Sequence, residues 1–268
     1  MSDNKNIELE IYDIHKKYKK KLADSRYNVK KNNLAAFNVV PNHPFRAMLC
    51  GGSGSGKTSL MMNLLCEKRY YFGYFSKIFC FCSTYHSDDL YAVFRHCYSE
   101  KKNDTVIEVV DEFDKDTINK LDSILEEQKA FIDNFGVSKS PRLLFIFDDI
   151  LGEKSLHKVL VKLLSKARHY NASSFVITQS YSQIPRSARL QFSNLFLFNP
   201  SPSEMEIVAH NHNNVYFDKK RMKAIMEHCF GVEKKFFHIN TQTKKYDQWY
   251  RCGLDQIYDP ASFEASSN

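Results

Sequence analysis

Glycine and proline are both scarce in this sequence, with nine and seven residues among 268. That composition excludes a collagen-like or other low-complexity chain. No apolar run approaches the length of a membrane span, so the sequence predicts no transmembrane helix. The first ten residues, MSDNKNIELE, are polar and lack the apolar core of a secretory signal. These absences leave a globular protein, and 43% hydrophobic residues are enough for a sizeable buried core.

The seven cysteines are odd in number and have no framework spacing. We therefore expect reduced thiols in a cytosol-like compartment. Cys80 and Cys82, with His86 nearby, invite a zinc interpretation. Alternation along a strand would place both thiols on one face, but no second ligand pair follows at a zinc-site spacing. Ordinary buried thiols are the better interpretation of these residues.

Positive charge is concentrated near the N-terminus. The chain has a net charge of +7, and residues 16–31 alone carry eight Lys and Arg against one Asp, so the remainder sums to zero. A basic arm on a neutral body suggests a polyanionic partner, although a solvated helix face or a flexible tail has the same composition. We predict an arm over residues 1–40. Four of its residues recur at helical spacing and make a short amphipathic helix possible: Ile7, Ile11, Ile14 and Tyr18.

Strand-like and helical patterns alternate through the main domain, predicted over residues 41–258, before a polar tail at 259–268. The predicted strands cover residues 45–50, 77–83, 105–110, 142–147, 174–178 and 195–198, and a closing hairpin pairs 236–240 with 248–252. The predicted helices cover residues 58–68, 88–98, 116–135, 155–170, 203–210 and 218–229. This pattern predicts an α/β fold with a mostly parallel central sheet flanked by helices and a C-terminal β-hairpin. In such folds ligands bind at the carboxyl ends of the strands.

A phosphate-binding loop follows the first predicted strand. The segment GGSGSGKT fits G-x-x-x-x-G-K-[ST] at every fixed position and precedes a helical pattern. Glycines let backbone N–H groups wrap around phosphate oxygens, and the helix adds its positive dipole end. The lysine would reach the β- and γ-phosphates of a nucleotide, and the threonine hydroxyl would ligate Mg²⁺. The alternative is a Gly/Ser linker that contains Lys-Thr by chance. The predicted nucleotide-binding residues are Gly51, Gly52, Ser53, Gly54, Ser55, Gly56, Lys57 and Thr58.

Two carboxylates follow a buried strand later in the chain, in the segment LLFIFDD. Asp148 is the candidate for holding Mg²⁺, directly or through a water. Asp149 is the candidate for polarising the attacking water. An Asp-Asp turn at a strand end is common, so this signal gains its meaning from the phosphate-binding loop.

Gln179 ends the next predicted strand, in the segment SFVITQS. At that position it could contact the γ-phosphate or the lytic water. The alternative is a turn residue that satisfies loop backbone groups.

In combination these motifs resemble the FtsK/HerA superfamily of DNA-pumping ATPases, and most closely the poxvirus-type genome-packaging ATPases of large DNA viruses and virophages. The shared pattern is PFR before GGSGSGKT, then LLFIFDD, ARHYN, ITQSYSQIP and FNPS, over roughly residues 44 to 200. Many members of the wider superfamily have Glu after the strand-end Asp, whereas this chain has Asp149. A shorter carboxylate has less reach toward a water molecule.

The resemblance implies ATP hydrolysis to ADP and phosphate by a homo-oligomeric ring that drives double-stranded DNA into a preformed capsid. It also implies a catalytic arginine from the neighbouring subunit, for which Arg168, Arg186 and Arg189 are candidates. It further implies a capsid protein as a partner and a location in the host cytoplasm or the virion. DNA contacts through the basic arm would reach the backbone and be independent of base sequence.

Two other functions fit the same motifs. One is a helicase or initiator-loader ATPase in DNA replication, which would unwind strands rather than translocate on duplex DNA. The other is an ATP-gated scaffold that assembles on DNA or capsid without a power stroke. A nucleotide kinase is disfavoured, because the sequence has no Arg-rich lid segment with a second acceptor site.

Overall fold

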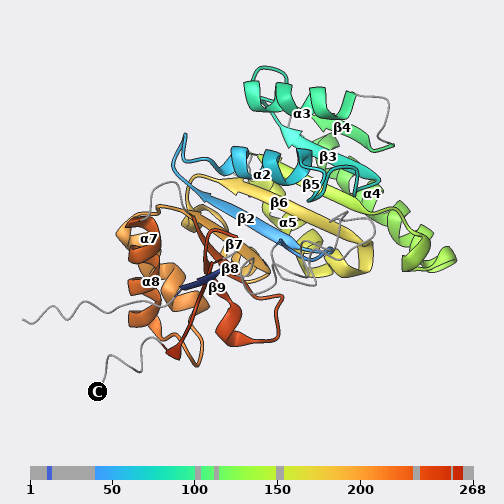
Figure 1. Ribbon diagram of the computed structural model, residues 1–268. Helices are drawn as coiled ribbons and strands as arrows, with labels where there is room; N and C mark the ends of the chain where they lie inside the picture. The colour runs from blue at the N-terminus through green and yellow to red at the C-terminus, as the bar shows by residue number, and fades with distance from the viewer. Residues whose placement is uncertain are drawn as a thin grey trace, which may run out of the picture.

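Six apolar segments of the sequence form the parallel part of one sheet (Figure 1). The computed structural model describes residues 11–13, 40–99, 104–111, 115–148, 154–231, 236–254 and 256–261. The parallel strands stand in the order β7-β2-β6-β5-β3-β4. Their bounds are Arg46–Gly51 for β2, Lys77–Cys82 for β3, Val106–Val110 for β4, Leu143–Asp148 for β5, Ala172–Thr178 for β6 and Asn194–Phe198 for β7. The predicted α/β fold with a mostly parallel sheet is therefore confirmed.

Antiparallel strands extend the sheet beyond β7. β8 (Phe237–Asn240) and β9 (Tyr250–Cys252) form the predicted C-terminal hairpin. β10 (Gln256–Tyr258) and β1 (Ile11–Asp13) follow as the last two strands and were not predicted. The possible helix at residues 7–18 is wrong at Ile11–Asp13, because these residues pair antiparallel with β10. The backbone groups of an edge strand need partners, and side-chain spacing does not report that need.

Helices cover both faces of the sheet, as the sequence predicts. Their bounds are Lys57–Cys66 for α2, Asp89–Ser99 for α3, Lys115–Phe135 for α4, Lys154–Lys166 for α5, Arg186–Arg189 for α6, Pro202–His212 for α7 and Lys219–Gly231 for α8. Residues Ala167–Tyr170, predicted as the last turn of the α5 helix, form a 3-10 helix instead. Asp88 caps α3 through its Oδ1, which accepts from the backbone N–H of Leu90 at 2.7 Å. Within the described residues, no helix is both long and apolar enough to cross a bilayer.

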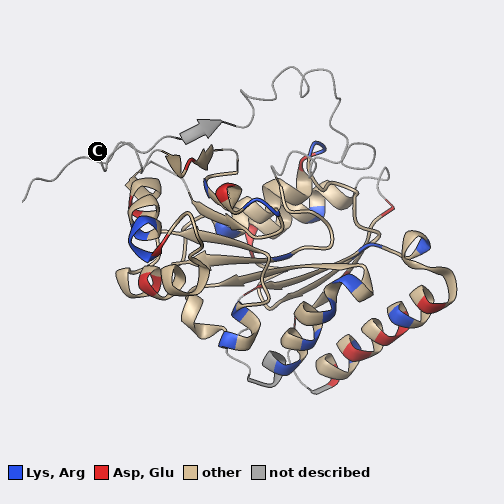
Figure 2. Ribbon diagram, turned by 90° about the horizontal axis from the view of Figure 1, so that it is seen from below, with Lys and Arg blue, Asp and Glu red and all other residues tan. Residues whose placement is uncertain are grey.

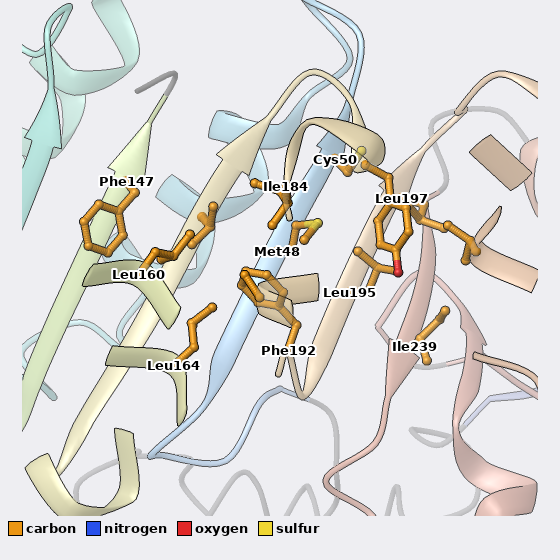
Figure 3. Close-up of a cluster of buried hydrophobic side chains, with 14 of the residues drawn as sticks. Met48, Cys50, Phe147, Leu160, Leu164, Ile184, Phe192, Leu195, Leu197 and Ile239 are labelled. Carbon is orange, nitrogen blue, oxygen red and sulfur yellow. The ribbon is translucent and has the colours of Figure 1, made fainter. Parts of the chain in front are cut away.

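The two faces of the sheet bury separate apolar clusters, because side chains alternate along each strand. Ala47 and Leu49 of β2 face a cluster shared with α2 and α3. Met48 and Cys50 of the same strand face a second cluster shared with α4 to α8. Figure 3 shows part of this second cluster, where Met48 packs among side chains of neighbouring strands and helices such as Leu160. The sheet is thus buried on both sides, as its continuous apolar strands predict.

A hydrogen-bond network joins the amino ends of the central strands around His43. Its Nε2 donates to Asn171 Oδ1 at 2.8 Å, and its Nδ1 accepts from Ser173 Oγ at 2.6 Å. Asn171 has a φ of 47°, in the left-handed region, and its Nδ2 donates to Ser140 Oγ at 3.0 Å. Burial, together with the charge of Arg142, lowers the pKa of His43 to about 4. The neutral imidazole therefore connects the segment before β2 with the start of β6.

We expect this network to weaken the fold in mild acid. The unfolded chain protonates His43 near pH 6.5, whereas the folded chain resists protonation until about pH 4. Stability from this group is therefore complete above pH 6.5 and is lost as the pH falls toward 4. The slope is at most roughly 1.4 kcal/mol per pH unit for one histidine. Buried His212, whose pKa is also lowered to about 4, adds a similar dependence.

The test is the unfolding free energy of His43→Gln, measured by urea titration between pH 7.5 and 4.5. The variant should be less stable than the wild type at neutral pH and should show a shallower pH dependence. His210→Gln is the matched control, because His210 is exposed. Equal pH slopes for His43→Gln and the wild type would contradict the role given to His43.

Candidate functional site

The phosphate-binding loop has the strand–loop–helix context that the motif predicts. β2 ends at Gly51, and α2 begins at Lys57. Gly54 and Gly56 have φ values of 69° and 98°, in the region that side chains with a Cβ rarely adopt. A Cβ at Gly54 would meet no heavy atom within 4 Å, so there is open space next to this residue. The loop therefore has the conformation and the room that a phosphate group requires.

Gly51 lets β2 and β7 approach each other closely. A Cβ at this position would lie 2.5 Å from the carbonyl oxygen of Phe198 and 2.6 Å from its Cβ. Gly51 and Phe198 are also paired in the register of these strands. The first glycine of the motif thus serves strand packing, while Gly54 and Gly56 serve the turn.

Lys57 and Ser55 place polar atoms beneath the loop. Lys57 is buried, and its Nζ donates to the carbonyl oxygens of Gly51 at 2.8 Å and Gly52 at 2.7 Å. The Ser55 Oγ is buried and has no hydrogen-bond partner among the residues that the structure describes. A buried hydroxyl without a partner is costly, and a phosphate oxygen would satisfy it. Thr58 follows as the second residue of α2 and is half-buried.

Strand register brings the other predicted residues to the same edge of the sheet. β6 lies between β2 and β5 and pairs in parallel with both. Thr178 of β6 is opposite Cys50 of β2, and Ile177 is opposite Asp148 of β5. Asp148, Gln179 and the phosphate-binding loop therefore all lie where parallel strands end. Gln179 is exposed at that edge.

Tyr91 of α3 holds the Asp148 carboxylate, and no sequence signal pointed to it. The Tyr91 hydroxyl donates to Asp148 Oδ2 at 2.8 Å. Burial raises the pKa of Tyr91 well above its usual range, with further contributions from nearby acidic groups. The phenol therefore remains a donor and fixes the position of one carboxylate oxygen of Asp148. Asp149, the predicted water-polarising residue, lies outside the described residues.

Glu204 connects the segment after Gln179 with the start of α7. Its Oε1 accepts hydrogen bonds from the Ser180 hydroxyl and, at 3.3 Å, from the backbone N–H of Ser182. Its own N–H donates to the Oγ of Ser201, the N-cap of α7. The sequence signal for this residue was the Ser201-x-x-Glu204 spacing of a capping box. In a capping box the Glu reaches back to its own N-cap, whereas Glu204 reaches across to the β6 segment.

Glu204 also acts electrostatically on the end of β2. Burial, followed by the charge of Glu204, raises the pKa of the Cys50 thiol to about 12, while Lys57 opposes this change. Cys50 therefore stays protonated and carries no nucleophilic chemistry.

The three candidate arginines lie in different places. Arg168 is exposed in the 3-10 helix before β6, at the amino end of that strand, away from the phosphate-binding loop. Arg186 is exposed at the start of α6. The guanidinium of Arg189 lies over the Tyr181 ring, 4.8 Å from its centroid. Arg189 is thus engaged within its own subunit, whereas Arg168 and Arg186 face outward.

The donor set fits Mg²⁺ better than a metal held by protein ligands alone. In the part of the chain that the structure describes, no group of three or more His, Cys, Asp or Glu could hold a metal ion. Mg²⁺ needs no such group, because one or two carboxylates and substrate phosphates usually bind it. Asp148 and the Thr58 hydroxyl, beside a phosphate-binding loop, are suitable ligands. Cys80 and Cys82 are buried in β3, and burial raises the pKa of both thiols.

Curated proteins similar in sequence come from poxviruses. The chain is 29% identical over 165 residues to the "DNA packaging protein OPG160" of Monkeypox virus, covering 61% of this chain and 50% of that protein. It is 31% identical over 170 residues to the protein of the same name from Vaccinia virus (strain Copenhagen), covering 61% and 56%. The chain thus spans about half the length of the curated relatives it matches.

Solved structures with a similar fold include a viral and a bacterial ATPase. B204, the DNA-packaging ATPase from Sulfolobus Turreted Icosahedral Virus, has a TM-score of 0.52 at 14% identity, covering 80% of this chain and 98% of that chain. EssC (ATPases 2 and 3) from Geobacillus thermodenitrificans has a TM-score of 0.53 at 14% identity, covering 83% and 42%. At this identity the likeness supports the fold alone.

A family model places the chain more directly. The model described as "Poxvirus A32 protein" matches residues 34–243. The match spans most of the chain and includes the phosphate-binding loop, Asp148 and Gln179. It confirms the resemblance to the poxvirus-type packaging ATPases. With this match and the α/β fold in agreement, the chain belongs to the Poxvirus A32 protein family.

Proposed function

We propose that this protein is an ATP-hydrolysing motor that moves double-stranded DNA into a viral capsid. The observation that carries the proposal is the meeting of the phosphate-binding loop, Asp148 and Gln179 at one edge of the sheet. Family membership and the DNA-packaging names of the relatives support the DNA part of the proposal. A ring of identical subunits, a capsid partner and a location in the host cytoplasm or virion are further parts of the same proposal.

The roles proposed for the site rest on position for the described residues and, for Asp149, on the sequence motif alone. The loop N–H groups and the start of α2 bind the nucleotide phosphates, and Lys57 exchanges its carbonyl partners for phosphate oxygens. Thr58 and Asp148 would hold Mg²⁺, which when bound neutralises charge on the β- and γ-phosphates. Asp149 accepts a proton from the attacking water, and Gln179 orients that water or the γ-phosphate. Glu204 then links the Gln179 segment to α7.

The decisive experiment for the function compares three activities of the purified protein with duplex DNA and ATP. A packaging motor hydrolyses ATP faster when duplex DNA is present and displaces a bound third strand without separating the duplex. Strand separation would instead identify a helicase or initiator-loader ATPase. Binding of DNA with no stimulated hydrolysis and no displacement would identify an ATP-gated scaffold.

Lys57→Ala should weaken ATP binding roughly ten- to hundredfold, because charge-assisted contacts to phosphate are lost. Calorimetric titration with ATP measures the affinity. Lys68→Ala is the matched control, since Lys68 is exposed just after α2. Wild-type ATP affinity in Lys57→Ala would contradict the assignment of the loop.

Asp149→Asn should bind ATP but hydrolyse it roughly 10²- to 10⁴-fold more slowly, because an amide cannot accept the proton from water. Asp148→Asn should instead weaken ATP binding and shift its Mg²⁺ dependence to higher concentration. Steady-state phosphate release and calorimetry separate the two effects. Asp111→Asn is the control, because Asp111 is an exposed carboxylate directly after strand β4. Normal turnover in Asp149→Asn would show that the roles are misassigned.

Mixed subunits test the arginine proposed to act from a neighbouring subunit. An Arg→Ala subunit and a Lys57→Ala subunit are each inactive, but a mixed ring contains some interfaces with both residues intact. Activity should partly return for Arg168 or Arg186, which are exposed, and not for Arg189, which packs on Tyr181. Such an arginine contributes roughly 10³–10⁵ in rate, so partial rescue is measurable. Absence of rescue for all three variants would exclude an interfacial role for them.

A further inference from the structure

The near-neutral body of the protein conceals a strong separation of charge. Residues 154–203 contain seven Lys and Arg and no Asp or Glu, so their net charge is +7. Residues 16–31 also have a net charge of +7. The rest of the chain is therefore net negative by the same amount. Within the basic segment, lysines recur every four residues along α5, at positions 154, 158, 162 and 166. A four-residue spacing places such residues along one side of a helix.

The fold gathers this charge on one face. α5 and the short α6 pack against each other. In Figure 2 both helices carry Lys and Arg segments and no acidic ones, whereas the long α4 beside them alternates in sign. Lys158, Lys166, Arg168 and Arg186 are exposed. We call this surface, formed by α5, the following 3-10 helix and α6, the α5–α6 face.

Most cations of this face lack a neutralising partner within the described residues. Lys162 is the exception, with its Nζ 2.7 Å from Asp122 Oδ1 of α4. Among the residues that the structure describes, no Asp or Glu forms an ion pair with Lys158, Lys166 or Arg186. On α8, by comparison, Lys219 and Lys223 both pair with Glu206. The α5–α6 face therefore has positive charge that is open to an external polyanion.

One structural interpretation, stabilisation of the helix dipole, explains only part of this charge. Cations near a helix C-terminus stabilise the helix dipole, which applies to Lys166 in the last turn of α5. Arg46 already donates to the Leu164 carbonyl at that end, at 3.1 Å. Lys158 lies in the middle of the helix, and the helix dipole does not account for it.

We propose that the α5–α6 face binds the phosphate backbone of duplex DNA. This inference rests on the proposed function and names the surface of the body that would contact the transported DNA. Lys158 and Lys166 are eight residues apart, or roughly 12 Å along the helix axis. Successive phosphates of one strand advance about 3.4 Å along the duplex, so the two lysines span three to four base pairs.

The composition of the face favours backbone contacts over base recognition. Its other exposed residues include Ser165 and Ser187, which can donate hydrogen bonds to phosphate. The aromatic Tyr170 of the 3-10 helix is buried and cannot stack on unpaired bases. Binding is therefore expected to be independent of sequence and to suit a duplex rather than a single strand.

The position of the face also connects it with the nucleotide site. The α5 segment follows β5, which ends at Asp148, and α6 follows β6 and Gln179. Glu204 contacts the Ser180–Ser182 segment that lies between Gln179 and α6. A change at the γ-phosphate position would therefore act on the Ser180–Ser182 segment, which leads into α6.

The test uses the full-length protein and the double variant Lys158→Gln/Lys166→Gln. Its affinity for a duplex of mixed sequence is measured by fluorescence anisotropy from 50 to 300 mM salt. Each lost phosphate contact removes about 0.9 from the log–log salt slope, so the slope should flatten by about 2. Affinity near 0.1 M salt should fall roughly ten- to hundredfold. Lys129→Gln/Lys139→Gln is the matched control, because both lysines are exposed on or beside α4, whose charges alternate in sign; its slope should equal that of the wild type.

The outcomes separate this inference from the proposed function. If the wild type binds duplex DNA and the Lys158→Gln/Lys166→Gln slope is unchanged, the α5–α6 face is not the DNA surface, while the motor proposal stands. If that variant instead changes the oligomeric state by sedimentation with an unchanged slope, the face contacts protein and the inference is overturned. If the wild type binds no duplex DNA at any salt concentration, both proposals fail. Thermal unfolding and ATP calorimetry check that the variants are folded.

Discussion

Parallel pairing of β6 with both β2 and β5 is the constraint on which the rest of the site depends. The register sets Cys50 opposite Thr178 and Ile177 opposite Asp148, so the three strands end together. The loop conformation alone would bind a phosphate, but chemistry requires a carboxylate and a polar side chain at the same edge. Close approach at Gly51 then brings the end of β7 against the end of β2.

Hydrogen bonds at the amino ends of the strands maintain this register. The neutral His43 connects the segment before β2 to Asn171 and Ser173 at the start of β6. Asn171 reaches further to Ser140, before β5. Hydrogen bonds at the amino ends thus fix the relative positions of strands whose carboxyl ends carry the proposed site. Because strands are nearly inextensible, a shift at one end would move the residues at the other.

The local charge of each surface of this protein is more informative than the summed charge of the chain. The net charge outside residues 16–31 is zero, because the positive charge of the α5–α6 face is balanced by negative charge elsewhere. Long-range attraction of a polyanion depends on the local field, which decays over about 8 to 10 Å at physiological salt. A face without carboxylates can therefore have a positive local field even when the whole body is neutral. The helices of that face begin after the strands that bear Asp148 and Gln179, so one segment of sequence serves both surfaces.

The sequence by itself determined the phosphate-binding loop, the alternation of strands and helices, and the polar residues that end β5 and β6. These features are local, because a glycine turn, an apolar run and a strand-end carboxylate are each encoded within a few neighbouring residues. Only the tertiary structure decided that Tyr91 holds Asp148, that Glu204 joins Ser180 to α7, and that β1 pairs with β10. Each of these contacts joins residues far apart in the chain. Strand order and helix packing create such contacts, and neither leaves a periodic pattern in the sequence.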